Sequence, residues 1–366
     1  MSVRHARTAV PSRPSRAAWP PLARVLWTAV GLAAACASLA GSPALAELPA
    51  AAVILLYQRV AEDANPSGSI RLDQLEAHLE ELRSAAYAVL PLPRVVDGLL
   101  RGAAGPHSLP DRAVAITIDD AYRSAYDIAW PRLRAAGLPF TMFVSSDSVD
   151  RRAPGFLGWA EIREMAAAGV TIGSQTASYA RLVMLPAEEA ASEIDRGLAR
   201  IEQMTGRRPT LFAYPYGEGR APLKALLKAR GIVAAFGQHS GVAHGRQDPL
   251  DGYPRFLLNE ALGGIDRFRL VASALPLPVL DATPQDTLVT DGNPPAIGFT
   301  LDPELADAGP VSCFATQTGR TLVERMDDRI EVRLSQPFPP GRARINCTMP
   351  GPEGRWRWLG AQFVVP

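Results

Sequence analysis

The amino-acid sequence predicts an α/β fold, a barrel of about seven strands, followed by a small all-β, sandwich-like domain. Short apolar runs alternate with amphipathic stretches from residue 51 to about residue 273, and after residue 296 the pattern changes to short β-rich runs. Strands that alternate with helices are typical of βα units around a mostly parallel sheet. About seven such units favour a barrel over an open sheet. With 47% hydrophobic and 20% charged residues among 366, the composition excludes a disordered chain.

Residues 1–46 have the composition of a targeting segment. They contain five arginines and no acidic residue, an apolar run over 25–40, and small residues at Ala44 and Ala46. A basic start, an apolar middle and small residues at a cleavage site are the features of a secretory signal peptide. The alternative is an uncleaved anchor in the inner membrane, although the run is shorter than the roughly 20 residues of a typical span. Both interpretations predict an exported protein that is periplasmic, secreted or membrane-anchored.

Residues 47–273 carry the βα pattern. The expected strands are 52–57, 113–118, 140–144, 170–172, 210–213, 232–236 and 255–258. The expected helices are 72–85, 125–136, 159–168, 186–204 and 222–229. In the first of these helices Leu75, Leu79 and Leu82 share one stripe, as in an amphipathic helix that packs on a sheet.

Residues 274–295 are rich in proline, aspartate and threonine and are expected to form a linker to the β domain, residues 296–366. Cys313 and Cys347 are the two cysteines that follow the targeting segment. They are expected to form a disulfide, because an exported chain matures in an oxidising compartment; two free buried thiols are the alternative. Trp356 and Trp358 are two residues apart and are expected on the same face of one strand. They either form a sugar-stacking platform or pack against side chains of neighbouring strands.

Three strand ends carry polar residues that suggest chemistry. The apolar run 115–118 ends in Asp119 and Asp120, at the carboxyl end of a strand, where barrel active sites collect their residues. The alternative is an acidic turn that caps the next helix. A hydroxyl-rich turn follows the strand near residue 171, and the turn Tyr214-Pro215-Tyr216-Gly217 ends a third strand.

The sequence resembles the polysaccharide deacetylase family (the NodB-homology domain, carbohydrate esterase family 4) over roughly residues 52–270. The resemblance rests on the order and spacing of the acid pair, the hydroxyl-rich turn and the Tyr-Pro-Tyr-Gly turn. The resemblance implies a distorted (β/α) barrel that removes N-acetyl or O-acetyl groups from a glycan. It implies Asp119 as general base, Asp120 as ligand of a divalent, zinc-like metal, and the backbone N–H of Tyr216 as a donor to the developing oxyanion. The β domain resembles an accessory domain of bacterial members.

The sequence departs from the family at the metal ligands. The two histidine positions of the second motif fall on Gln175 and Tyr179, which are weak ligands, whereas a zinc site takes three protein ligands. The arginine of the third motif falls on Ala213, so the charge that would tune the base is expected to be absent. Other histidines are His78, expected in solvent, His107 in a loop, and His239 and His244, which are alternative ligands near the barrel mouth.

Two functions follow. The first is an exported polysaccharide deacetylase-like hydrolase that acts on a polysaccharide or oligosaccharide through Asp119 and Asp120. The second is a catalytically inactive glycan-binding protein, or a partner in the assembly of envelope polysaccharide. Its sugar site would be lined by aromatic residues, namely Tyr122, Trp159, Tyr179, Tyr214 and Tyr216. With 38 basic and 37 acidic residues the chain has a formal charge of +1, which gives no reason to expect a nucleic-acid partner.

Overall fold

The computed structural model describes residues 49–84, 86–102, 108–290, 292–305, 308–316 and 319–366. The predicted signal peptide or anchor lies outside these residues. Within the described residues, every helix is too short or too polar to cross a membrane.

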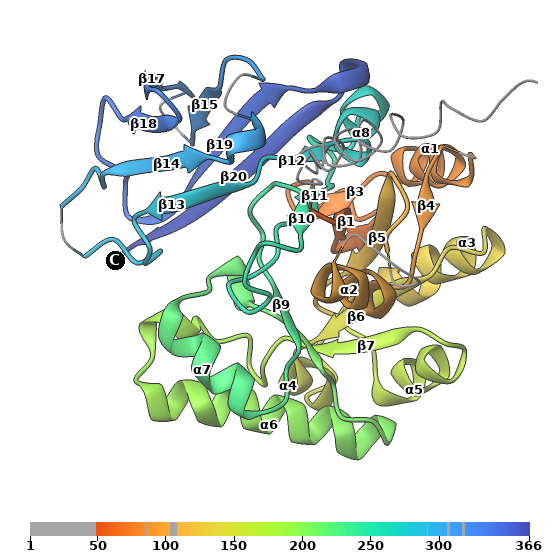
Figure 1. The fold of residues 1–366 in the computed structure, drawn as a ribbon. Helices are drawn as coiled ribbons and strands as arrows, with labels where there is room; N and C mark the ends of the chain where they lie inside the picture. Colours follow the sequence, from red (N-terminus) through yellow and green to blue (C-terminus); the bar gives the residue numbers. More distant parts are fainter. Residues whose placement is uncertain (1–48, 85, 103–107, 291, 306–307, 317–318) are drawn as a thin grey trace, which may run out of the picture. The chain divides into compact units, whose positions relative to one another are not determined.

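The first part of the chain forms a curled, half-barrel sheet. Its main path runs β10-β1-β5-β6-β7-β8-β9, with β11 paired to β1 and β4 paired to β5 (Figure 1). The strands are β1 (Ala51–Tyr57), β4 (Ala88–Val89), β5 (Ala113–Ile118), β6 (Phe140–Val144), β7 (Thr171–Ser174), β8 (Leu211–Ala213), β9 (Ala234–Phe236), β10 (Ala243–His244) and β11 (Phe256–Leu257). Apart from the antiparallel β10, neighbouring strands are parallel. The predicted α/β class and barrel-like sheet are confirmed.

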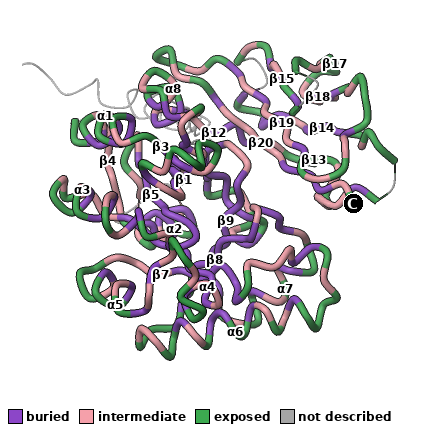
Figure 2. The backbone as a smooth tube through the Cα atoms, turned by 180° about the vertical axis from the view of Figure 1, so that it is seen from behind, coloured by how far each residue is buried: buried purple, intermediate pink, exposed green. Residues whose placement is uncertain are grey.

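Helices connect the strands and cover the sheet. They are α1 (Leu72–Arg83), α2 (Leu92–Arg101), α3 (Trp130–Ala135), α4 (Ser146–Asp150), α5 (Trp159–Ala167), α6 (Ala187–Thr205), α7 (Ala221–Ala229) and α8 (Ile265–Ala272). A π-helix, Ala125–Ala129, precedes α3 within the expected helix 125–136. The long α6 buries Ala190, Ile194, Leu198 and Ile201 on one stripe, which is the amphipathic pattern of a helix on a sheet. Figure 2 shows buried strands and exposed outer faces of α6 and α7.

The last part of the chain is all-β. One sheet has the order β12-β20-β19-β15-β16 and the other the order β13-β14-β18-β17. The strands are β12 (Leu275–Pro276), β13 (Val279–Thr283), β14 (Ile297–Leu301), β15 (Ser312–Ala315), β16 (Gly319–Arg320), β17 (Leu322–Met326), β18 (Arg329–Arg333), β19 (Gly341–Pro350) and β20 (Trp356–Val365). Side chains of both sheets, such as Phe299, Ile330 and Ile345, share one apolar core. Because β12 and β13 lie within 274–295, this segment is built into the sheets and is not a free linker.

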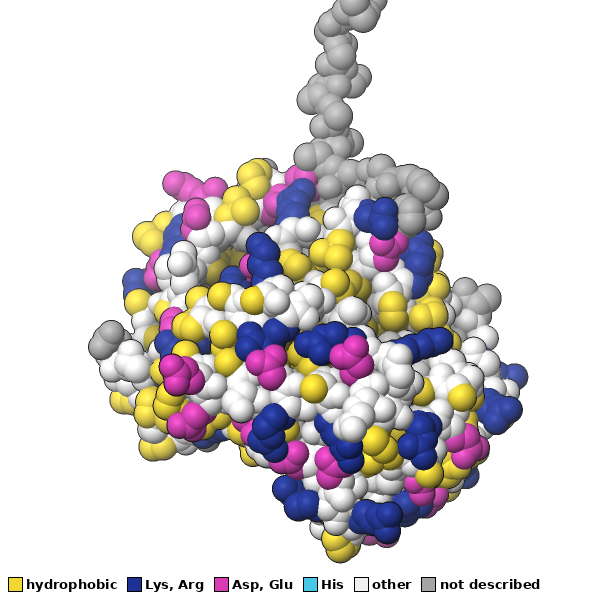
Figure 3. All heavy atoms as spheres, turned by 90° about the horizontal axis from the view of Figure 1, so that it is seen from below, with side chains coloured by type: hydrophobic (Ala, Val, Ile, Leu, Met, Phe, Trp, Pro, Cys, Tyr) yellow, Lys and Arg dark blue, Asp and Glu magenta, His cyan; other side chains and the backbone are white. Residues whose placement is uncertain are grey.

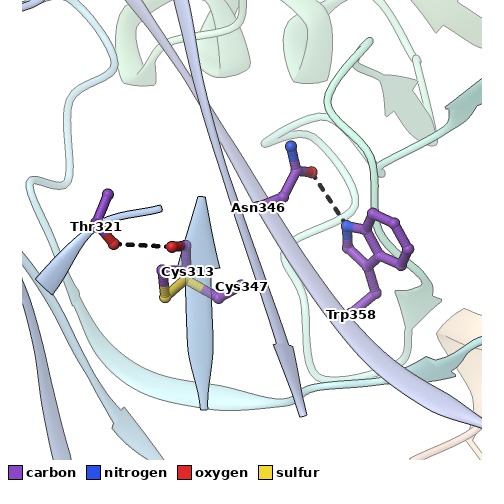
Figure 4. The surroundings of a disulfide bond; sticks show 5 residues. All are labelled: Cys313, Thr321, Asn346, Cys347 and Trp358. Atoms are coloured by element: carbon purple, nitrogen blue, oxygen red, sulfur yellow. Dashed lines mark hydrogen bonds between the residues drawn. A yellow bond between two sulfur atoms is a disulfide. The ribbon is translucent and has the colours of Figure 1, made fainter. Parts of the chain in front are cut away.

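The disulfide joins two strands of the β part. Cys313 on β15 lies directly opposite Cys347 on β19, and the two sulfur atoms are bonded (Figure 4). The predicted disulfide is therefore confirmed.

The half-barrel and the β part form one compact unit from Leu48 to Pro366. Gln362 Nε2 on β20 donates a hydrogen bond to the carbonyl of Tyr216 (3.0 Å), and Arg355 pairs with Asp111 at 2.9 Å. The ring of Phe256, from β11, meets the ring of Trp358 edge to face at 5.2 Å. The β part thus contacts the half-barrel in three places: at Asp111 before the start of β5, at Phe256 on β11, and at the Tyr216 turn after β8.

Candidate active site

The two aspartates lie at the carboxyl end of β5, where the chain leaves the strand in a sharp turn. The N–H of Asp119 still pairs with the Tyr57 carbonyl (2.9 Å), and that of Asp120 with the Phe143 carbonyl (3.0 Å), so neighbouring strands hold both residues. Asp120 and Ala121 then have positive φ values of 73° and 53°, which turns the chain sharply. Both carboxylates are buried.

Asp119 forms a buried ion pair with Arg255, which lies just before β11. Arg255 NH1 donates to Oδ1 at 2.7 Å and NH2 to Oδ2 at 2.8 Å, and both side chains are fully buried. Nε donates to the Gly237 carbonyl at 2.8 Å, and NH1 also donates to Thr117 Oγ1 at 3.1 Å. The expectation that no charge faces the base was therefore wrong: Arg255, not residue 213, supplies it. An arginine inside an apolar run was the available signal, since a buried charge needs a partner.

Gln175 bridges the two aspartates. Its Nε2 donates to Asp119 Oδ2 (3.1 Å), and its Oε1 accepts the backbone N–H of Asp120 (3.2 Å). This orientation of the amide places its donor on the carboxylate and its acceptor on the Asp120 N–H, which the Phe143 carbonyl shares. The amide oxygen, the atom that could bind a metal, is therefore turned to the backbone.

Tyr179 is engaged in the same way. Its Oη accepts the backbone N–H of Tyr216 at 3.3 Å, and the two rings meet edge to face at 4.8 Å. Burial and the charges of Asp120 and Asp119 raise the pKa of the Tyr179 phenol, so it stays protonated and is a poor metal ligand. Tyr216 has a left-handed φ of 59°, and its N–H is the donor that the resemblance assigns to the oxyanion.

Asp120 is the least satisfied of these groups. Its Oδ2 accepts a hydrogen bond from Gln58 Nε2 at 3.2 Å, whereas its buried Oδ1 has no partner among the described residues. Burial, together with the charge of Asp119, raises the pKa of Asp120 to about 7. A buried carboxylate oxygen of this kind is open to a donor from a ligand.

The residues present do not fit the metal that the resemblance implies. Of the three expected ligands only Asp120 has a free oxygen, because the oxygens of Gln175 and Tyr179 accept backbone N–H groups. Across the described part of the chain, no three His, Cys, Asp or Glu side chains are grouped so that they could hold a metal ion. We therefore derive no chemical step through a metal.

The other histidines do not replace the missing ligands. His78 is fully buried between Tyr57 Oη (3.0 Å) and the Gly263 carbonyl (2.8 Å), so the expectation that it faces solvent was wrong. His244 pairs with Ala51 at the start of β1, whereas Asp119 lies beyond the other end of β1. His244 is therefore at the wrong end of the strand to join the aspartates. His239 follows β9 and binds the N–H of Arg255 through its carbonyl. His107 lies outside the described residues.

The structure gathers only part of the expected aromatic lining. Tyr179 and Tyr216 lie together beside the aspartates. Burial and then the charge of Asp120 raise the pKa of Tyr122, whose ring lies 3.4 Å from the Arg59 guanidinium carbon. Tyr214 is fully buried, with its hydroxyl donated to the Leu250 carbonyl, so its assignment to a sugar surface was wrong. Trp159 donates to Asp150 and lines a separate hollow of about 720 Å³ beside α4 and α5.

Comparisons with known proteins agree with this architecture. The family model described as Polysaccharide deacetylase matches residues 107–235. A relative from Bacillus subtilis (strain 168), "Putative polysaccharide deacetylase YxkH", is 28% identical over 173 residues, which are 47% of this chain and 58% of the relative. The chain thus spans less than two thirds of the length of that relative.

Solved structures share the fold. The deacetylase PplD of Streptococcus pyogenes, in complex with acetate, has a TM-score of 0.55 at 18% identity and covers 61% of this chain and 99% of its own. IcaB of Ammonifex degensii has a TM-score of 0.54 at 25% identity and covers 62% of this chain and 99% of its own.

Replacement of Arg255 tests the buried ion pair. We expect Arg255→Leu to lower the free energy of unfolding by about 3–5 kcal/mol, because Asp119 is left buried and unpaired. The double variant Asp119→Leu/Arg255→Leu should lose less than the single variant, since it leaves no lone charge. Urea denaturation of the three proteins measures this. A single variant as stable as the original chain would contradict the assignment.

Asp120→Asn tests the raised pKa of Asp120. Since the folded chain binds this proton more tightly than the unfolded chain, the carboxyl destabilises the fold progressively as pH rises from about 4 to about 7. The neutral amide removes this loss, so the variant should be more stable than the original chain at pH 8, by on the order of 3 kcal/mol, and nearly equal at pH 4. Thermal unfolding at both pH values checks the sign. The exposed Asp63→Asn is the control, and a gain at pH 4 alone would refute the prediction.

Proposed function

We propose that this chain, whose residues 107–235 match the polysaccharide deacetylase family model, binds an acetylated polysaccharide and does not hydrolyse it at a metal centre. The family model and the name of YxkH support the ligand class. We extend the proposal to export of the chain, which the disulfide Cys313–Cys347 supports because such bonds persist in oxidising compartments.

One observation carries the proposal. The side-chain oxygens of Gln175 and Tyr179 each accept a backbone N–H, from Asp120 and Tyr216 respectively. The first contact engages the amide oxygen of Gln175, the atom that could bind a metal. The second also occupies the N–H that would stabilise an oxyanion. The same two bonds therefore weaken metal binding and transition-state stabilisation together.

The remaining groups suit binding of a sugar. Asp120 Oδ1 can accept a hydrogen bond from a hydroxyl or an acetamido N–H of the glycan. The half-buried rings of Tyr179 and Tyr216, and the face of Tyr122 that Arg59 leaves uncovered, can pack against a pyranose ring. Such a site needs neither a metal nor a free oxyanion donor.

A second candidate function is hydrolysis of acetyl groups with Asp119 as general base. It is favoured by the Arg255 guanidinium, which fixes both Asp119 oxygens by hydrogen bonds of 2.7 and 2.8 Å. A positioned carboxylate is one requirement of general base catalysis.

Binding and acetate release distinguish the two functions. We expect an N-acetylated chito-hexasaccharide to bind the purified full chain in calorimetry. Acetate release should not exceed that of Asp119→Asn, and bound zinc should be well below one per chain after dialysis. Acetate production that disappears in Asp119→Asn would overturn the binding-only proposal and establish the second candidate.

Histidines at the two ligand positions should restore a metal site. We expect Gln175→His/Tyr179→His to bind zinc at least about tenfold more tightly than the original chain, because two imidazoles then join Asp120 as a three-ligand set. The matched control is Gln175→Asn/Tyr179→Phe, which disturbs the same contacts without adding an imidazole. Competition with a fluorescent chelator measures the affinity. Equal affinity in both double variants would mean that these positions are not the ligand positions.

A further inference from the structure

A groove lies on the outer face of the β20-β19-β15-β16 sheet, beside α8. Its volume is about 510 Å³. Aromatic side chains, Phe314, Trp356 and Trp358, line it together with the polar Ser312, Asn346 and Thr348. Leu270 of α8 and Arg320 of β16 complete the lining. The candidate active site shares none of these residues.

The strand period explains this lining. Cys313, Cys347 and Met349 point into the β core, so Ser312, Phe314, Asn346 and Thr348 point to the opposite face. The register aligns Ser312 with Thr348 and Thr348 with Trp358, and it places Phe314 opposite Asn346. Polar and aromatic side chains therefore alternate across the strands.

The exposed aromatic residues are not explained by packing. Phe314 is 45% and Trp356 is 38% exposed, on a sheet face whose other side is a closed apolar core. Hydrogen-bonding groups stand between the rings, which distinguishes the groove from a purely apolar interface. Flat rings beside hydroxyl and amide groups match a pyranose, which has an apolar C–H face and a polar rim.

The charge of the groove lining limits which ligands can bind. Among the described residues that line the groove, Arg320 alone is charged, and none is a carboxylate. A cationic ligand, such as a basic peptide or a deacetylated amino-sugar chain, therefore lacks a counter-charge, whereas an acetylated chain meets no penalty.

The groove is held in one shape. The indole N–H of Trp358 donates to Asn346 Oδ1 at 3.1 Å (Figure 4). The ring of Phe256 packs edge to face against the same indole from the half-barrel. Beneath the groove the disulfide ties β15 to β19, the two strands that carry its polar residues. A preorganised site loses less entropy when a ligand binds.

We infer that this groove is a second polysaccharide-binding site, which takes an acetylated chain in preference to its deacetylated form; the identity of the ligand rests on the proposed function. Strand β20 carries both Trp356 and Gln362, whose amide donates to the Tyr216 carbonyl at 3.0 Å; between these two residues, Trp358 and Gly360 pack against Phe256 and Ser240 of the half-barrel. One strand thus fixes the distance between the two sites. A polymer that reaches both gains affinity through effective concentration.

Exposed groove residues allow a test in the folded full chain. The probe is N-acetylated chito-hexasaccharide, and its fully deacetylated counterpart is the comparison ligand, both followed by calorimetry and by tryptophan fluorescence. We expect Phe314→Ala/Trp356→Ala to weaken binding of the acetylated probe about tenfold. Trp356→Phe should retain most of the affinity, because a ring remains. The matched control is Met326→Ala, an exposed apolar residue on β17 that is 55% exposed and lies outside the groove.

A second variant separates this inference from the proposed function. Tyr122→Ala changes the acid-pair site only. If Tyr122→Ala abolishes binding and the groove variant binds normally, the groove inference fails and the proposed function stands. If the groove variant abolishes binding and Tyr122→Ala binds normally, the proposed function fails and the groove stands. Equal affinity for both sugars, or a dimer in sedimentation velocity that Trp356→Ala dissociates, would overturn the groove inference.

Discussion

The buried ion pair between Asp119 and Arg255 is the constraint on which the site depends. Both side chains are fully removed from water, which is costly for two charges unless each is paired and its remaining hydrogen bonds are made. The guanidinium meets this condition. It binds both oxygens of Asp119, and its Nε binds the Gly237 carbonyl in the loop after β9. Residues from the ends of β5, β9 and β11 are thereby held together.

From this pair a chain of hydrogen bonds leads to the second acid. Gln175 donates a hydrogen bond to Asp119 and accepts one from the backbone N–H of Asp120. The amide therefore helps to fix the position of each aspartate relative to the other. It is neutral, however, and cannot offset the charge of Asp120. Gln58 donates one hydrogen bond to that carboxyl, and the charges of Arg255 and Arg59 only partly lower its pKa. The buried acid therefore holds its proton up to near-neutral pH.

Local patterns in the sequence predicted much of the fold. The expected strands 113–118 and 140–144 coincide with β5 and β6, because both are continuous apolar runs with clear ends. The disulfide followed from the number of cysteines and the expected compartment. Contacts between distant segments were not predictable in this way. Arg255 is 136 residues from Asp119, and His78 is 185 residues from its Gly263 partner, so no spacing rule connects them. Tyr214 was misassigned for the same reason, since only the packed structure reveals that its ring is in the core.

The acid pair alone is weak evidence for turnover, and the physical reason lies in its burial. Loss of either Asp119 or Arg255 leaves a buried charge without a partner, which destabilises the fold regardless of catalysis. A chain that has no catalytic role would therefore still need the pair. Gln175 and Tyr179 are not constrained in this way, because replacing a neutral group that accepts a backbone N–H costs less free energy of unfolding than unpairing a buried charge. Their identity is thus the more informative guide to function. It favours a site in which the backbone N–H of Tyr216 is already satisfied by a phenol before any ligand arrives.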